Sequence, residues 1–168
     1  MFRPVLAALL PLLAAGAAMG AEAPDYSPLQ LYEGAWKVVM PTPVGPPLTV
    51  GMVNSCGRVG VNFACQQALA GVPGAMTIFL PTALRGRWRT QTVSGDGLVD
   101  GALPGELTIE GPVWTFLSQE KTATGVSWTR NINRFAGADR IHFEVAKSSD
   151  GKTWVLDVSG DEVRVPQP

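Results

Sequence analysis

The stretch GVSWTRNINRFAGADRIHFEVAKSSDGKTWVLDVSGDE, residues 125–162, decides the fold. It contains three strand-like runs, 127–135, 140–147 and 153–158. In each run apolar and polar side chains alternate, as they do in a β-strand with one buried face. Turn-forming residues join the first two runs, and Asp150-Gly151, a strong hairpin signal, stands between the second and the third. The stretch therefore predicts three sequential antiparallel strands.

Upstream residues repeat the same pattern. Further strand-like runs lie at 31–40, 48–54, 61–69, 75–80, 86–93, 107–110 and 113–118. The chain has 168 residues, 46% of them hydrophobic, with 19 glycines and 14 prolines, and this length suits one core. We predict an all-β fold, a single antiparallel up-and-down β-barrel of about 8–10 strands, because a barrel closes many sequential hairpins without leaving edges. The alternative is a two-sheet β-sandwich.

The N-terminal residues have the composition of a secretory signal. Arg3 precedes an apolar run over 5–13, and small residues follow at 14–20. We expect a signal peptide over 1–20, a flexible leader over 21–30 and a barrel domain over 31–165. The apolar run is short for a membrane anchor, so we expect an exported protein, periplasmic or secreted, with no membrane span after cleavage.

Export determines the interpretation of the two cysteines. Cys56 and Cys65 are close in sequence, and in an oxidising compartment such a pair is most simply a disulfide. A reactive thiol or half of a metal site is disfavoured, because the chain has no CxxC motif and its one histidine, His142, is distant in sequence.

The first strand carries a resemblance to a known group of proteins. Gly34-Ala35-Trp36 resembles the Gly-x-Trp that opens the first strand of lipocalins and other calycin-type barrels. The resemblance implies that Trp36 plugs the closed end of the barrel, with Arg164 as the basic residue stacked on it. It also implies that the barrel can hold a small ligand.

No catalytic constellation is recognisable, and we expect neither an enzyme nor a cofactor. A Gly-x-Ser-x-Gly motif and a Cys/His/carboxylate metal cluster are both missing from the sequence. His142 alternates with apolar residues and is expected to face outward, which argues against the haem-binding calycins. The net charge of −1 argues against a nucleic-acid partner.

The expected partner is a small apolar or amphipathic ligand inside the barrel. The residues expected to line its site are Trp36, Phe63, Trp128, Arg130, Phe143 and Trp154. Arg130 shares a strand face with Trp128 and Ile132, so it lies either inside with an anionic partner or at a solvated rim. The alternative function is a periplasmic protein-interaction or enzyme-inhibitor module with a filled barrel, acting through the loops 42–47 or 94–103.

Overall fold

The computed structural model describes residues 24–93 and 102–166. It has one short 3-10 helix, η1 (Pro28–Tyr32), and ten strands. The strands are β1 (Gly34–Met40), β2 (Leu48–Val59), β3 (Asn62–Leu69), β4 (Val72–Pro81), β5 (Arg87–Val93), β6 (Ala102–Glu110), β7 (Val113–Thr122), β8 (Gly125–Phe135), β9 (Arg140–Ser148) and β10 (Val155–Arg164).

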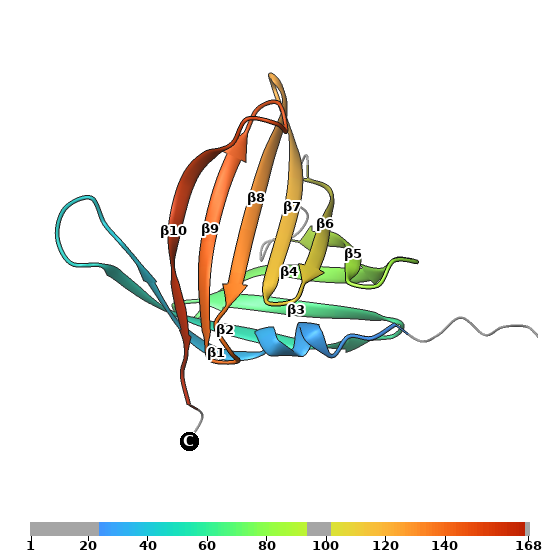
Figure 1. Cartoon of the computed structure of the whole chain (residues 1–168), viewed down its shortest axis with the longest axis horizontal. Coiled ribbons are helices and arrows are strands. Elements are labelled where there is room, and N and C mark those ends of the chain that lie inside the picture. The colour runs from blue at the N-terminus through green and yellow to red at the C-terminus, as the bar shows by residue number, and fades with distance from the viewer. Residues whose placement is uncertain (1–23, 94–101, 167–168) are drawn as a thin grey trace, which may run out of the picture.

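Sequential antiparallel pairing closes these strands into a barrel. Each strand pairs with the next in sequence, and β1 pairs with both β2 and β10. The prediction of a single up-and-down barrel is confirmed, and the sandwich alternative is wrong. In Figure 1, β7 to β10 stand side by side as one wall, β2 to β4 cross them steeply, and η1 lies at the lower end.

The segment before β1 contributes to the core at that end. Tyr26 and Leu29 are buried, and the Tyr26 hydroxyl donates a hydrogen bond to the Val61 carbonyl at 2.6 Å. The Tyr26 ring stacks on Phe63, with ring centroids 5.6 Å apart. Residues 24–30, which the sequence places in a flexible leader, are therefore packed onto the barrel, while residues 1–23, with the predicted signal peptide, lie outside the described residues.

The last strand differs from its prediction. The sequence places it at 153–158, but β10 runs from Val155 to Arg164 and its pairing with β9 shifts between Leu156 and Val158. Such a β-bulge inserts one residue and resets which side chains point inward. Leu156 consequently faces outward, and Val158, Gly160 and Glu162 face the interior.

Cys56 and Cys65 form the predicted disulfide. They are directly paired on β2 and β3, with their Cα atoms 4.0 Å apart and a sequence separation of nine residues. The bond ties together the two arms of one hairpin beside the core.

Removing this disulfide is expected to destabilise the barrel. The double variant Cys56→Ala/Cys65→Ala should lose about 2.5–3 kcal/mol of unfolding free energy, since the bond restricts the unfolded chain. Urea denaturation of the oxidised wild type and the variant measures the difference. Wild type treated with a reductant serves as the control and should behave like the variant, whereas an unchanged urea midpoint in the variant would contradict a structural role.

Candidate ligand cavity

The register of β7 and β8 shows which face of β8 points inward. Buried Trp114 on β7 pairs with Asn133, and Phe116 pairs with Asn131. Directly opposed residues share a sheet face, so Asn131 and Asn133 point into the barrel. Asn133 has no exposed surface. The expectation that Trp128 lines the interior is therefore wrong, and so is the interior alternative for Arg130, because alternation places both on the outer face together with Ile132.

The loop between β9 and β10 covers that outer face. The guanidinium carbon of Arg130 lies 4.4 Å from the centre of the Trp154 ring. A β-carbon on Gly151 would approach the Trp128 ring to 3.1 Å, so the loop backbone lies against this ring. Arg130 is thus neither an interior residue with an anionic partner nor a free rim residue. It stacks on Trp154 outside the barrel, a cation–π contact that shields apolar surface.

Asp150 holds this covering loop in place. Its carboxylate accepts hydrogen bonds from the backbone amides of Lys152, at 2.8 Å, and Thr153, at 2.7 Å. The Ser148 hydroxyl donates to the same carboxylate at 2.8 Å. These hydrogen bonds, above all the two from backbone amides, hold the pKa of the Asp150 carboxyl well below its usual range. The Asp-Gly turn recognised in the sequence therefore also positions Trp154.

The closed end of the barrel has the arrangement that the calycin resemblance implied. Trp36 is 1% exposed, and the Arg164 guanidinium carbon lies 4.2 Å from the centre of its ring. Arg164 also donates hydrogen bonds to the carbonyls of Glu33, Leu31 and Ala138, at 2.6, 2.7 and 3.0 Å. Gly34 has φ of +114°, and a β-carbon there would lie 2.9 Å from Nη1 of Arg164, so this position needs glycine.

A cavity of about 240 Å³ lies in the barrel beyond this end. Three aromatic rings border it, those of Tyr32, Phe79 and Phe116. Hydroxyl and amide side chains make up most of the remaining border: Asn54, Gln67, Thr77, Thr90, Thr92, Ser118 and Asn131. The cavity therefore combines an aromatic surface with several hydrogen-bonding groups. That mixture suits an amphipathic molecule better than a purely apolar one.

Tyr32 connects this cavity to a buried polar cluster. Its backbone carbonyl accepts hydrogen bonds from Trp36 Nε1 and Asn54 Nδ2, each at 3.1 Å, which fix the end of η1. Its hydroxyl accepts a hydrogen bond from Asn133 Nδ2. Burial raises the pKa of Tyr32 well above its usual value, the negative charge of Glu162 raises it further, and the bond from Asn133 lowers it.

Glu162 is the charged member of that cluster. It points inward from β10 between Val38 on β1 and Ile141 on β9, and it is 7% exposed. Its Oε2 atom is buried and makes no hydrogen bond. Burial raises the pKa of this carboxyl to about 7. An interior acid without a partner is energetically costly, and such groups concentrate at functional sites.

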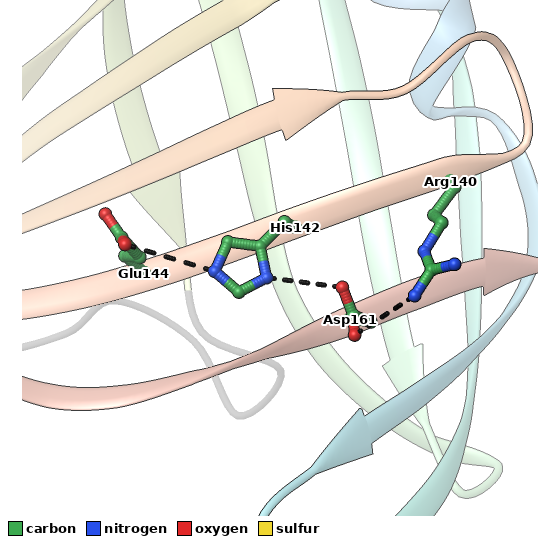
Figure 2. Close-up of polar contacts among 4 residues, drawn as sticks. All are labelled: Arg140, His142, Glu144 and Asp161. Carbon is green, nitrogen blue, oxygen red and sulfur yellow. Dashed lines mark hydrogen bonds and ion pairs between the residues drawn. The ribbon is translucent and has the colours of Figure 1, made fainter.

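Polar residues of β9 and β10 form an ion-pair cluster on the outer face (Figure 2). His142 Nδ1 lies 3.2 Å from an oxygen of Asp161, and His142 Nε2 lies 3.9 Å from Glu144. Arg140 lies 3.4 Å from the same Asp161. His142 thus faces outward, as the alternation predicted. All four side chains are well exposed, so the cluster contributes little to stability.

None of the six residues predicted to line a ligand site borders the cavity. Trp36, Phe63 and Phe143 are buried inside the barrel, where they form core. Trp128, Arg130 and Trp154 lie outside it. Asn131 and Gln67 could be read from the sequence as either polar liners or surface groups, whereas the threonines and Ser118 were missed because such residues in a strand usually indicate a solvated face. The sequence did contain one signal for the cavity: Asn131 and Asn133 share the strand face opposite that of Trp128.

Comparisons with known proteins bear on the fold. No family model matches the chain, and no curated protein matches it in sequence. Among solved structures, the S-type phycobiliprotein lyase CPES from Guillardia theta is similar, with 12% identity over 84% of this chain and 93% of that chain and a TM-score of 0.51. Rv2717c from M. tuberculosis has 13% identity over 84% and 97% of the respective chains, with a TM-score of 0.47. The chain therefore has a calycin-like barrel fold.

Residues 24–93 and 102–166 contain no helix long and apolar enough to cross a membrane. They also contain no group of three or more His, Cys, Asp or Glu residues placed to hold a metal ion.

Proposed function

We propose that this chain is a binding protein, not an enzyme, and that it takes a small amphipathic molecule into its barrel. The cavity of about 240 Å³, with aromatic rings on one side and hydroxyl and amide groups around it, is the observation that carries the proposal. A barrel of this kind either fills its interior with side chains or keeps room for one ligand. Here the closed end is filled, and the space beyond Tyr32 is open.

The polar border of the cavity refines the class of ligand. The Oδ1 atom of Asn131, a cavity-lining residue, is buried and has no hydrogen-bond partner. Buried polar atoms are nearly always hydrogen-bonded, so this oxygen calls for a donor from a bound molecule or a bound water. The ring surfaces of Phe79 and Phe116 offer contacts for an apolar portion. A molecule with one polar end and one apolar end satisfies both surfaces.

Blocking the cavity provides the test. Thr92→Phe introduces a large side chain into the cavity, and Gln91→Phe places the same ring on the other face of β5 as a matched control. Native mass spectrometry of the protein purified from its own host should show a retained small molecule in the wild type and the control. The Thr92→Phe variant should retain at least tenfold less, which corresponds to about 1.4 kcal/mol or more of binding free energy. Equal retention in a folded Thr92→Phe variant would contradict a cavity site.

A second candidate function is protein interaction through a loop. The connection between β1 and β2, residues 41–47, extends away from the barrel (Figure 1), and Val44 is 90% exposed. The other loop proposed for such an interaction is 94–103, of which residues 94–101 lie outside the described ranges. Deleting 43–46 should leave the small-molecule mass unchanged if the cavity carries the function, and should release a co-purifying protein if this loop does.

The proposal also places the protein in an oxidising compartment, as periplasmic or secreted. The Cys56–Cys65 disulfide supports this location, because such bonds persist outside the reducing cytosol. N-terminal sequencing of the protein from its host tests it. The expected result is a mature chain that starts near residue 21, before the packed Tyr26.

A further inference from the structure

The unpaired polar atoms inside this barrel are all of one kind. Among the described residues, the buried side-chain atoms without hydrogen bonds on the inner face are Asn131 Oδ1, Asn133 Oδ1 and Glu162 Oε2. Each is an acceptor oxygen. The remaining buried side-chain atom without a hydrogen bond, Arg130 Nε, is a donor and lies on the outer face. The interior therefore has acceptors in excess and needs donors.

These acceptors lie along one path that starts at the cavity. Asn131 and Tyr32 border it. Asn133 bonds to the Tyr32 hydroxyl and is opposite Phe143 on β9, which is opposite Gly160 on β10, two positions before Glu162 on the same inner face. The negative charge of Glu162 also raises the pKa of Tyr32. Glu162 does not itself border the cavity, so its influence on a ligand passes across Tyr32 and Asn133. In a dry interior such a charge acts more strongly than it would in water.

Within residues 24–93 and 102–166, no cationic side chain pairs with Glu162. The residues opposite it on β1 and β9, Val38 and Ile141, are uncharged. Arg164 is two positions further along the same face, but its guanidinium is held by Trp36 and by three backbone carbonyls. The other titratable side chain facing Glu162, Tyr32, carries no positive charge. The carboxylate therefore leaves the interior with an uncompensated negative potential.

We propose that the ligand of this barrel carries a cationic, N–H-donating head group, such as a protonated amine, which binds at Asn131 and Tyr32 under the attraction of Glu162. This inference rests on the proposed function and specifies the chemical class of its ligand. The donors of an ammonium group match the unpaired acceptors, and its charge matches that of Glu162. Phe79 and Phe116 contact the apolar remainder of the molecule.

Three probes with one carbon skeleton test the head group. Isothermal titration of the full mature chain with 2-phenylethylamine, 2-phenylethanol and phenylacetate, at pH 8, compares a cation, a neutral molecule and an anion. The amine should bind at least tenfold more tightly than the alcohol, and phenylacetate should bind most weakly. Glu162→Gln should remove at least tenfold from amine affinity and change alcohol affinity less than twofold.

Matched variants separate charge from general damage. Glu144→Gln removes a carboxylate from the outer face of the neighbouring strand and should leave the amine preference unchanged. Asn131→Leu removes a cavity acceptor at nearly constant volume and should weaken amine binding several-fold, which keeps the test valid if Glu162→Gln misfolds. Amine affinity of the wild type should also rise between pH 6 and pH 8 as Glu162 ionises, because an alkylamine, like lysine with its pKa of about 10.4, stays protonated.

The outcomes distinguish the two proposals. Alcohol binding equal to or tighter than amine binding, or an amine preference that survives in both Glu162→Gln and Asn131→Leu, would overturn the cationic head group and leave the cavity proposal standing. Water would then satisfy the acceptors. Failure of all three probes to bind, together with no retained molecule in native mass spectrometry, would overturn the binding function and this inference with it.

Discussion

Replacing Trp36 by alanine is expected to lower the free energy of unfolding by about 3–5 kcal/mol. The side chain is 1% exposed and forms one side of the closed end, beneath the Arg164 guanidinium. Its indole N–H also donates to the Tyr32 carbonyl, so the substitution leaves a large void and removes one of the two side-chain hydrogen bonds to that carbonyl. Urea denaturation followed by circular dichroism measures the loss.

A second tryptophan provides the control for this result. Trp128 is half-buried on the outer face, against the loop that contains Gly151. Trp128→Ala should cost about 1–2 kcal/mol, because less surface is removed from contact. Equal losses for the two variants, or a larger loss at Trp128, would contradict the assignment of Trp36 to the sealed end and of Trp128 to the outside.

Replacing Glu162 by glutamine is expected to stabilise the protein at neutral and alkaline pH by about 3 kcal/mol, as the rise in its carboxyl pKa from 4.5 to about 7 implies. The folded state holds this proton more tightly than the unfolded state. The stabilisation from the proton is therefore complete below pH 4.5 and is lost as the pH rises toward 7. Glutamine resembles the protonated form of glutamate, and its side chain does not ionise in this pH range.

The difference in unfolding free energy between wild type and Glu162→Gln isolates this group from other titrations. It should be small at pH 4.5, should grow as the pH rises, and should level off above pH 7. Glu144→Gln, on the outer face, should show no such growth. A difference that stays constant from pH 4.5 to pH 8 would mean that Glu162 is not buried as a lone acid.

Local signals predicted the fold and one end of the barrel correctly. Turn residues and alternation over 125–162 determine hairpins directly, and ten sequentially paired strands favour closure into a barrel. The roles of Trp36 and Arg164 followed from a motif resemblance, and the disulfide followed from spacing and compartment. These features depend on residues that are neighbours in sequence or carry a recognisable pattern.

The cavity was not predictable in the same way, and β8 shows why. Its outer face, with Trp128 and Ile132, is more apolar than its inner face because the loop containing Trp154 covers it, so hydrophobicity selects the wrong side. The bulge between Leu156 and Val158 then reverses the alternation in β10. Strict alternation without that register shift places Leu156 inside the barrel. The bulge itself cannot be recognised from the amino-acid composition of the strand.

NMR mapping of the 2-phenylethylamine binding site tests whether the ligand binds inside the barrel, in the cavity next to Tyr32 and Asn131. Backbone amide shifts of the isotope-labelled chain report which residues sense the ligand. An interior site predicts the largest saturable shifts at Thr77, Thr90 and Asn131, which lie on three strands around the cavity. Saturable shifts concentrated at Trp128, Arg130 and Trp154, or in the loop 41–47, would contradict it and place binding on the outside of the barrel.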